Sequence, residues 1–494
     1  MLEIIRKAEN FNDRIAIVSA GQEFNYQTLV TESRKVSATI LQNSGDLAGQ
    51  RVAYMVTPGF DYVKVQWGIW QAGGIAVPIN HGSPLESLQY VLEDSKTSVV
   101  LVSPKYKAIL ANYCNKNEIK IYTTEEFNKN PSQLPDVQKD NPAMILYTSG
   151  TTGSPKGVVT SHANIEAQIK ALVEAWQWTS DDATVNILPL HHVHGIINIV
   201  SCALWAGASC HFIAKFEAKK VFELIKFQQV NVFMAVPTIY FKLIAYWQDL
   251  DGDDKGKIAS ALSKMRLMVS GSAALPVSIL EKWQEISGQT LLERYGMTEI
   301  GMAIGNPYYG TRKPGYVGQP LPNVKIRLVD EEGEIVDDVE QGEIQVSGPG
   351  VFKSYWNRPQ ATEEAFTKDG WFKTGDIAIL EENSYKILGR SSVDIIKSGG
   401  YKISALEIEE VLRNHPDISD CAVVGIADEE WGEIIGAGLV LAVPKFETDK
   451  LKLWLKEKLP GYKVPRRYLV LEDLPRNAMG KVTKKELKEL FNNQ

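Results

Sequence analysis

Short apolar runs alternate with amphipathic stretches over most of the chain, and this alternation constrains the fold more than any other feature. Apolar runs are expected to form buried strands at residues 52–56, 98–103, 143–148, 230–236 and 265–270. Helical patterns lie between them, for example at residues 61–72 and 218–228. Because buried parallel strands are apolar on both faces, this alternation predicts α/β layers with mostly parallel sheets.

The pattern changes after about residue 315. Two strand patterns at residues 324–330 and 342–348 flank an acidic turn, which predicts a β-rich region. Helix and strand patterns then mix from about residue 405 to the end. Since 494 residues exceed what one core usually serves, we expect a large N-terminal domain at residues 1–389 and a small α+β C-terminal domain at residues 390–494.

The composition is that of an ordinary globular protein, with 44% hydrophobic and 23% charged residues. A net charge of -7 gives no general reason to bind nucleic acid or an anionic membrane. The cysteines are scattered without a close pair, which indicates reduced thiols. No signal peptide, membrane-spanning run or C-terminal lipidation motif is recognisable, so a cytoplasmic location is expected, with a processed organellar enzyme as the alternative.

The segment YTSGTTGSPKG, from Tyr147 to Gly157, is the strongest local motif. It follows an apolar strand and combines glycines, hydroxyl side chains and a lysine, which together suit a phosphate. The spacing is not that of a Walker A loop. A flexible surface loop is the alternative interpretation. The residues expected to bind phosphate are Thr148, Ser149, Gly150, Thr151, Thr152, Gly153 and Lys156.

Further motifs follow in the chain: PLHHVHG, GSAALP, RYGMTE, TGD, LGR, KSGGYKIS and PRNAMGK. With the phosphate loop, this set resembles the core motifs of the adenylate-forming superfamily, in that family's order and from about residue 15 to the C-terminus. The superfamily comprises acyl-CoA synthetases, luciferases and peptide-synthetase adenylation domains. The resemblance implies a mobile C-terminal domain.

The resemblance also implies a two-step reaction. A carboxylic acid attacks the α-phosphorus of ATP to give an acyl-adenylate and pyrophosphate, and the thiol of CoA then displaces AMP. ATP and Mg²⁺ are the expected cofactors, and CoA is the co-substrate. Lys481 resembles the lysine that stabilises charge during adenylation. Glu299 resembles the Mg²⁺ ligand, with Thr148 as a second candidate ligand.

Other nucleotide contacts are implied by position within the motifs. Thr298 is expected at the α-phosphate and Tyr295 against the adenine. Asp376 is expected to accept both ribose hydroxyls, with Arg390 assisting. The remaining residues expected to line the nucleotide site are Gly271, Ser272, Ala273 and Gly296.

Three histidines occur in the HHVH segment, at positions 191, 192 and 194. Zinc is an alternative interpretation, but no cysteine pair or fourth ligand accompanies them. The resemblance instead makes His192 a gate between the acyl and pantetheine sites.

The thioester-forming step is expected to involve the segment that follows Arg390. Its residues are Lys397, Gly399, Gly400 and Tyr401. The segment is one residue longer than in many relatives, so the hinge for domain rotation is assigned only to residues 391–394.

Arg294 bears on the choice of acid. A guanidinium beside an alkyl chain would be buried at high cost, whereas it can bind a carboxylate through two hydrogen bonds. The sequence is most similar to malonyl-CoA synthetases, in which arginines matching Arg294 and Arg266 hold the distal carboxylate of malonate or methylmalonate. Met302 would limit the pocket length. The alternative is a structural ion pair of Arg294 with Glu293 or another carboxylate.

Two other functions remain open from the sequence. One is a short- or medium-chain acyl-CoA synthetase for monocarboxylates, and the other is a carrier-protein-loading or non-catalytic nucleotide-binding module. Small-molecule substrates are the expected partners, and the chain is expected to be a monomer or a homodimer.

Overall fold

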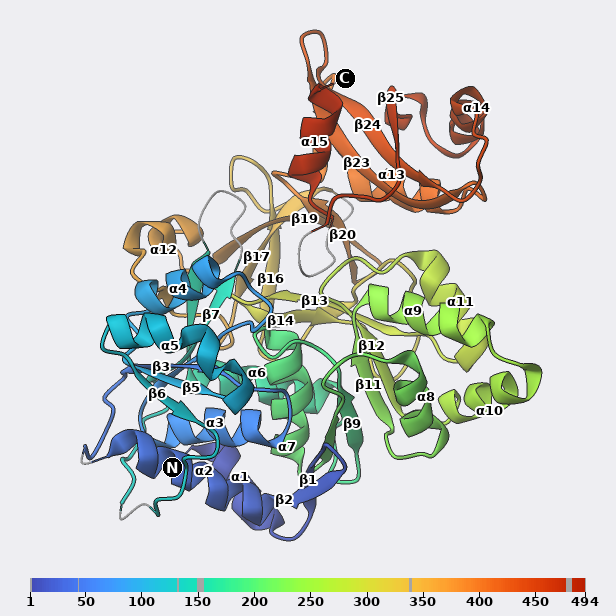
Figure 1. The fold of residues 1–494 in the computed structure, drawn as a ribbon. Coiled ribbons are helices and arrows are strands. Elements are labelled where there is room, and N and C mark those ends of the chain that lie inside the picture. The colour runs from blue at the N-terminus through green and yellow to red at the C-terminus, as the bar shows by residue number, and fades with distance from the viewer. Residues whose placement is uncertain are drawn as a thin grey trace.

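The computed structural model contains a large domain and a smaller C-terminal domain (Figure 1). The structure describes residues 2–42, 44–130, 133–148, 155–336, 340–476 and 482–493. Within these ranges, no helix combines the length and the apolar character that crossing a bilayer requires.

The first sheet has nine strands and forms one half of the large domain. Its six central strands, β13 through β1 in the order below, are parallel, and the strands at both edges are antiparallel. In spatial order the strands are β15 (Gln319–Pro320), β14 (Gly301–Gly305), β13 (Leu292–Met297), β12 (Leu267–Ser270), β11 (Val232–Ala235), β9 (Ala183–Asn186), β10 (Ser209–Phe212), β1 (Ile15–Ser19) and β2 (Gln22–Asn25).

The second sheet has seven strands, of which five are parallel. Strands β3, β4 and β5 are buried along almost their whole length, as expected for parallel strands covered by helices on both faces. In spatial order the strands are β18 (Ser354–Tyr355), β8 (Lys156–Ser161), β7 (Pro142–Thr148), β4 (Ile75–Pro78), β3 (Arg51–Met55), β5 (Val99–Val102) and β6 (Lys120–Thr123).

A third, antiparallel sheet lies between these two sheets and the C-terminal domain (Figure 1). Its strands are β16 (Lys325–Val329), β17 (Gly342–Ser347), β19 (Phe372–Glu381) and β20 (Ser384–Arg390). The C-terminal domain is built on a fourth sheet, whose strands are β22 (Tyr401–Ser404), β21 (Ile395–Ser398), β24 (Gly432–Leu441), β23 (Ile418–Asp428) and β25 (Arg467–Leu471).

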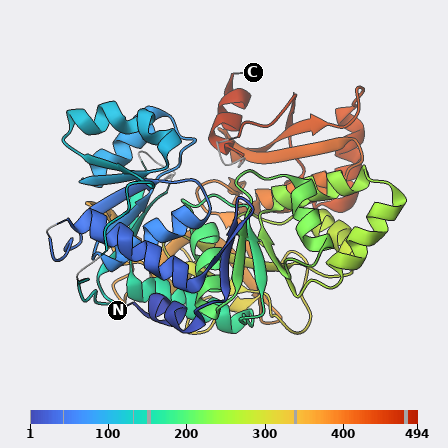
Figure 2. The ribbon, with the colours of Figure 1, turned by 60° about the horizontal axis from the view of Figure 1, so that its bottom comes forward.

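Helices cover the sheets of both domains, and Figure 2 shows the C-terminal domain beside the helices α8–α11. The helices of the large domain are α1 (Glu3–Phe11), α2 (Tyr26–Leu41), α3 (Phe60–Gln71), α4 (Leu85–Asp94), α5 (Lys107–Lys116), α6 (His162–Ala175), the π-helix η2 (His194–Ser201), α7 (Cys202–Ala206), α8 (Ala218–Lys226), α9 (Pro237–Gln248), α10 (Gly252–Leu262), α11 (Val277–Ser287) and α12 (Pro359–Ala365). Those of the C-terminal domain are α13 (Ala405–Arg413), α14 (Thr448–Lys458) and α15 (Lys484–Asn492), and short 3₁₀ turns are η1 (Pro104–Tyr106) and η3 (Gly461–Lys463).

The expected α/β architecture is confirmed. All five predicted apolar strands are present as β3, β5, β7, β11 and β12, and the β-rich region is the third sheet. Strand β20 extends to Arg390, one residue beyond the predicted domain boundary. The hairpin β21–β22 and strand β25 were not predicted: the hairpin strands each have only two apolar residues, and the apolar run of β25 is only four residues long.

Gly68 allows α2 and α3 to pack closely. A Cβ atom at Gly68 would lie 2.5 Å from Val36 Cβ and 2.7 Å from the Ser33 carbonyl oxygen.

We therefore predict that Gly68→Ala lowers the free energy of unfolding by about 1–3 kcal/mol, because the helices must move apart. Gly256→Ala is the control, since that α10 position has open space for a methyl group. Because alanine favours the helix, this substitution should raise the free energy of unfolding by about 0.5–1 kcal/mol. Urea unfolding measures both, and equal effects would contradict the packing argument.

Candidate functional site

Strand β13 and the turn after it carry many of the predicted site residues. Successive side chains of a strand point to opposite faces, and here Arg294 and Tyr295 contact different groups. Arg294 donates a hydrogen bond to Ser272, whereas Tyr295 donates to Asp376. The strand therefore separates two regions, which we call the acyl side and the nucleotide side.

On the nucleotide side, the structure brings Tyr295, Asp376 and Arg390 together as the sequence predicts. The Tyr295 hydroxyl lies 2.6 Å from Asp376 Oδ2, and Arg390 Nε lies 2.9 Å from Asp376 Oδ1. Asp376 and Arg390 are direct cross-strand partners in β19 and β20. An ionised carboxylate has about four acceptor positions, so Asp376 keeps capacity for ribose hydroxyls.

The two ends of the predicted phosphate loop also lie on this side. Thr148 ends β7 and Lys156 begins β8, next to each other in the antiparallel ladder. Lys156 Nζ lies 5.1 Å from the centre of the Tyr355 ring, and the Tyr355 hydroxyl donates to Glu299 Oε1 over 2.9 Å. Tyr355 thus links the loop lysine to the predicted Mg²⁺ ligand, a residue that the sequence analysis missed because no phosphate-binding pattern surrounds it.

Several predicted site residues cannot be placed. The loop residues Ser149, Gly150, Thr151, Thr152 and Gly153, together with Lys481, lie outside the described residues. Their roles remain predictions.

Glu299 fits the chemistry of a Mg²⁺ ligand. Its side chain is buried, and burial raises the pKa of its carboxyl group. A buried carboxylate of this kind is stabilised by a nearby cation, and carboxylate oxygen is a preferred Mg²⁺ ligand. Thr298 lies in the same turn, between β13 and β14, and is partly exposed.

The acyl side is organised around the guanidinium of Arg294. Arg294 Nη2 lies 3.1 Å from Ser272 Oγ, and Ser272 Oγ lies 3.2 Å from His194 Nδ1. A Cβ atom at Gly271 would lie 2.5 Å from Arg294 Nε, so glycine is needed there for the guanidinium to fit. Ser272 and Ala273 are exposed, which leaves this group within reach of a small molecule. The sequence analysis assigned Gly271, Ser272 and Ala273 to the nucleotide site, whereas here Gly271 and Ser272 contact Arg294; a role at the nucleotide remains a prediction.

Arg294 is buried and has no charge partner within the described part of the chain. The residue is 4% exposed, and among the described residues no carboxylate forms an ion pair with it. Burial lowers the pKa of Arg294 to about 9, so the side chain still carries its charge at neutral pH. The alternative ion pair with Glu293 is not present, because Glu293 accepts instead from the Gly315 N–H.

The histidines near Arg294 are neutral at physiological pH. Burial lowers the pKa of His192 to about 4, and burial together with the charge of Arg294 lowers that of His194 well below its usual value. His194 begins the π-helix η2, an uncommon element that often occurs at functional sites. No three His, Cys, Asp or Glu side chains in the described part of the chain are grouped to hold a metal ion.

The prediction for Arg266 is wrong. Its guanidinium forms a two-point ion pair with Asp182, at 2.7 and 2.9 Å, and also donates to the Trp176 carbonyl oxygen. Arg266 precedes β12, whereas Gly271 and Ser272 follow that strand. Because the strand separates the two arginines, Arg266 stabilises the buried Asp182 and does not contribute to the acyl side.

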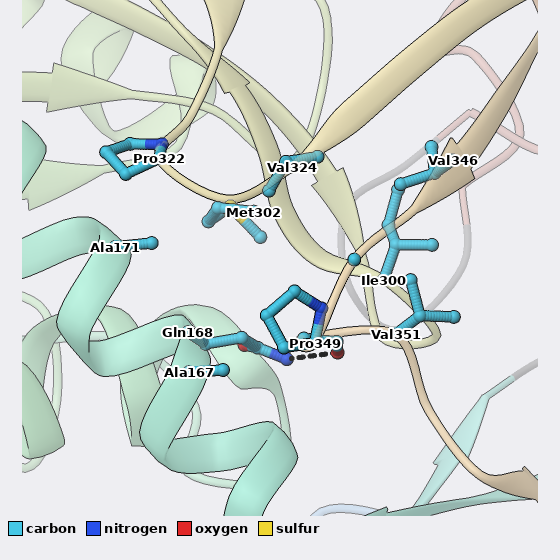
Figure 3. Close-up of a pocket in the computed structure, with 12 residues that line it drawn as sticks. Ala167, Gln168, Ala171, Ile300, Met302, Pro322, Val324, Val346, Pro349 and Val351 are labelled. Atoms are coloured by element: carbon cyan, nitrogen blue, oxygen red, sulfur yellow. Dashed lines mark hydrogen bonds between the residues drawn. The ribbon is translucent and has the colours of Figure 1, made fainter.

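Met302 lies in the wall of a small apolar pocket between α6 and β14 (Figure 3). The other wall residues include Gln168, Ala171 and Ile300. Met302 pairs with Gly296 across β13 and β14, and its methyl group would contact any Cβ at Gly296. The prediction that Met302 limits the length of the acyl pocket is compatible with this position and remains a prediction.

The predicted thioester-forming residues lie on the C-terminal domain. Gly399 packs against Trp431, Tyr401 stacks on Tyr462 with ring centres 4.5 Å apart, and Lys397 forms an ion pair with Glu331. Both Gly399 and Gly400 have positive φ, which explains the glycines. Their role in thioester formation remains a prediction.

Glu293 offers a test of the electrostatics beside this site. Burial, with a smaller effect of the charge on Glu410, raises the pKa of Glu293 to about 8. The pKa of a glutamate in an unfolded chain is about 4.3. As the pH rises from that value to about 8, the unfolded state releases its proton while the folded state keeps it, so the folded state loses stability. Glu293→Gln removes this loss and keeps an acceptor for the Gly315 N–H.

We therefore predict that the Tm of Glu293→Gln, relative to the wild type, rises with pH across that window and then levels off. Thermal unfolding at a series of pH values measures this difference. A difference independent of pH would show that Glu293 is not protonated in the folded protein.

Two family models match the chain. One, AMP-binding enzyme, matches residues 4–356, and the other, the AMP-binding enzyme C-terminal domain, matches residues 407–481. The chain is 42% identical to the mitochondrial malonate–CoA ligase ACSF3 of Xenopus laevis, covering 99% of this chain and 91% of the relative. It is 38% identical to a malonate–CoA ligase of Arabidopsis thaliana, covering 99% and 88%.

A solved structure has the same fold. ATP-bound MatB from Rhodopseudomonas palustris superimposes with a TM-score of 0.90 at 32% identity, covering 100% of this chain and 99% of MatB.

The expected cytoplasmic location is contradicted. The relative from Xenopus laevis and three further vertebrate relatives are named as mitochondrial proteins. The cytoplasmic prediction rested on the lack of a recognisable targeting signal, and that reasoning does not separate the cytoplasm from an organelle. The family models, the relatives and the fold agree on one conclusion: the chain belongs to the AMP-binding, adenylate-forming enzymes and is an AMP-forming acid–CoA ligase.

Proposed function

We propose that the protein is a malonate–CoA ligase, which converts malonate, ATP and CoA to malonyl-CoA, AMP and pyrophosphate. The observation that carries this proposal is the buried guanidinium of Arg294, which has no carboxylate partner in the described protein. Burying a charge without a partner costs roughly several kcal/mol of desolvation free energy. A substrate with a second carboxylate would remove that cost when it binds.

The malonate–CoA ligases of Xenopus laevis and Arabidopsis thaliana support this choice, because they are similar over nearly the whole chain. A monocarboxylate substrate agrees less well with the site. An alkyl chain placed against Arg294 would keep the guanidinium unpaired and would exclude the water that could solvate it.

We assign distinct tasks to the two ends of malonate. Arg294 and Ser272 bind the distal carboxylate, and neutral His194, next to Ser272, adds no competing charge. The proximal carboxylate then attacks the α-phosphorus of ATP and forms an acyl–phosphate bond, while pyrophosphate leaves. Fixing the distal end limits the motion of the nucleophile, and such orientation lowers the barrier of a bimolecular step.

The nucleotide side holds the other reactant. Asp376, supported by Arg390 and Tyr295, would accept the ribose hydroxyls, and Lys156 would contact the phosphates. Mg²⁺, held by Glu299, would supply positive charge to the phosphates. Lys481 would stabilise the charge that develops as the carboxylate approaches.

Arg294→Met tests the substrate assignment. We predict that it lowers kcat/KM for malonate at least about thirtyfold, because the distal carboxylate loses its charge partner. This factor corresponds to a loss of about 2–5 kcal/mol of binding free energy. The exchange of pyrophosphate into ATP, with malonate or butyrate as the acid, measures the effect. Loss with both acids to the same degree would contradict the assignment.

Protein stability separates a binding role from a structural role. Arg294→Met should leave Tm unchanged or higher, because it removes a buried charge that no carboxylate of the described chain neutralises. Arg266→Met is the matched control: it should lower stability by about 3–5 kcal/mol, because Asp182 loses its partner, without changing the malonate preference.

Tyr355→Phe tests the metal assignment. The substitution removes the hydroxyl that holds Glu299, so the concentration of Mg²⁺ needed for half-maximal exchange should rise about tenfold, with the KM for malonate little changed. Tyr316→Phe is the control, since the Tyr316 hydroxyl donates to Glu381, which has no predicted role at the site. An unchanged Mg²⁺ requirement in Tyr355→Phe would refute the role of this hydrogen bond.

A further inference from the structure

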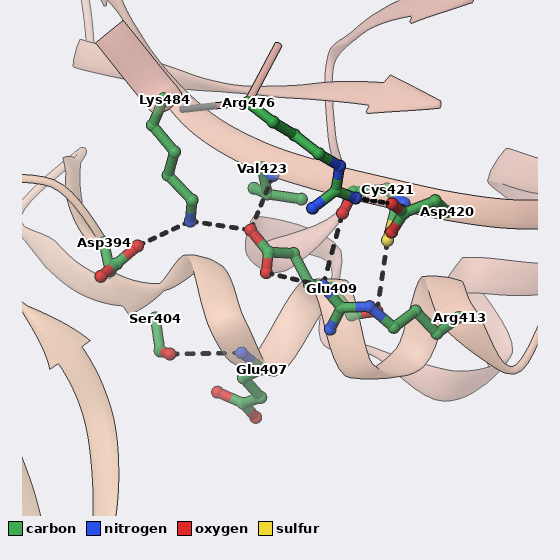
Figure 4. A network of polar contacts seen from close by, with 10 residues as sticks. All are labelled: Asp394, Ser404, Glu407, Glu409, Arg413, Asp420, Cys421, Val423, Arg476 and Lys484. Atoms are coloured by element: carbon green, nitrogen blue, oxygen red, sulfur yellow. Dashed lines mark hydrogen bonds and ion pairs between the residues drawn. The ribbon is translucent and has the colours of Figure 1, made fainter. Parts of the chain in front are cut away.

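A buried group of ion pairs lies where α15 begins (Figure 4). Lys484, the first residue of α15, has its Nζ 2.6 Å from Asp394 Oδ1 and 2.7 Å from Glu409 Oε1. The side chains of Lys484 and Glu409 are 9% and 4% exposed. Burial alone would lower the pKa of Lys484, but the two carboxylates outweigh it and raise the pKa, so Lys484 is charged.

Asp394 connects this group to the predicted hinge. Its Oδ2 accepts the Arg390 N–H over 3.0 Å, and its own N–H donates to the Arg390 carbonyl oxygen over 2.7 Å. Arg390 is in turn bound to Asp376 on the nucleotide side. One carboxylate therefore contacts both the last residue of β20 and the first residue of α15, across the segment expected to rotate.

Glu409 holds Lys484 from the other side and is itself fixed by further partners. Glu409 Oε1 accepts the Val423 N–H over 2.9 Å, and Glu409 Oε2 lies 3.1 Å from Arg413 Nη2. Arg413 thus shares Glu409 with Lys484, and within the described part of the chain it forms no ion pair with Asp394. The distance between Lys484 and the hinge is set by Asp394.

The residues on either side of positions 477–481 are tied together and to this group. Arg476 pairs with Val482 as an isolated β-bridge, and the Thr483 N–H donates to the Pro475 carbonyl oxygen over 2.8 Å. Arg476 also forms an ion pair with Asp420 in β23. Lys484 follows Lys481 by three residues, so its ion pairs fix the chain close to the predicted adenylation lysine.

We infer that Lys484 is a positioning residue for the adenylation step: through Asp394 it fixes the start of α15, and with it the chain next to Lys481, relative to the hinge and the nucleotide side. This inference rests on the proposed function. In this role Lys484 acts through Asp394 and Glu409. Its charge matters because it holds Asp394, whose second oxygen binds the Arg390 N–H.

Two half-reactions measured separately test this role. Adenylation is followed by malonate-dependent exchange of pyrophosphate into ATP. The thioester step is followed by first loading the enzyme with malonate, MgATP and pyrophosphatase, and then measuring the burst of malonyl-CoA when CoA is added. The variants are Lys484→Met, which removes the lysine charge, Lys484→Arg, which keeps it, and Asp394→Asn, which removes the carboxylate charge that faces both Lys484 and the Arg390 N–H.

Arg413→Met is the matched control, because it removes the other buried cation from Glu409 and leaves the Lys484–Asp394 pair in place. We expect Lys484→Met and Asp394→Asn to slow exchange about tenfold or more, as small displacements of catalytic groups do, and to change the thioester burst less than about twofold. Lys484→Arg should recover most of the exchange. In Arg413→Met the ratio of the two rates should equal that of the wild type.

The inference would be overturned if Asp394→Asn slowed both steps equally. It would also be overturned if Arg413→Met and Asp394→Asn had the same ratio of exchange rate to thioester burst rate. Either result would show a merely structural role. If Lys484→Met does not fold, Asp394→Asn and Lys484→Arg still decide the question. Wild-type protein without malonate-dependent exchange would refute the proposed function, whereas active wild type with unaffected Asp394→Asn would refute only the role of Lys484.

Discussion

The guanidinium of Arg294, which is buried and has no carboxylate partner among the described residues, is the constraint to which the acyl side is adapted. A Cβ atom at Gly271 would come too close to the guanidinium, so glycine is required there. The Ser272 hydroxyl accepts a hydrogen bond from Arg294 Nη2, and His194 stays neutral next to Ser272. Folded proteins rarely keep a charge at 4% exposure without a partner. The cost of burying Arg294 is consistent with a site whose missing partner is the ligand.

The side chains of strand β13 point alternately to the acyl side and to the nucleotide side. Arg294 contacts the acyl side and Tyr295 the nucleotide side, so neighbouring residues address the two reactants of one step. Glu299 follows in the next turn, where it meets Tyr355. A shift of one residue in the pairing of β13 would exchange the two faces, which is why the register with β12 and β14 matters for function as well as for stability.

Sequence motifs indicate which residues lie together, because each motif places several residues within one turn or strand; their roles at the substrates remain predictions. Asp376 and Arg390 are close because TGD and LGR lie on paired strands, and both were predicted. Arg266 was misassigned because a sequence pattern does not show which end of a strand meets the site, nor that Asp182, 84 residues away, would bind it. Tyr355 and Lys484 were missed for a similar reason: their partners lie far away in the sequence, and only tertiary packing brings them together.

The most direct test of the central claim is a crystal structure of the protein with malonate and a non-hydrolysable ATP analogue. The account predicts one malonate carboxylate within hydrogen-bond distance of Arg294 Nη2 and Ser272 Oγ, with the other directed at the α-phosphorus. Malonate bound elsewhere, or bound with Arg294 still lacking a carboxylate partner, would contradict it.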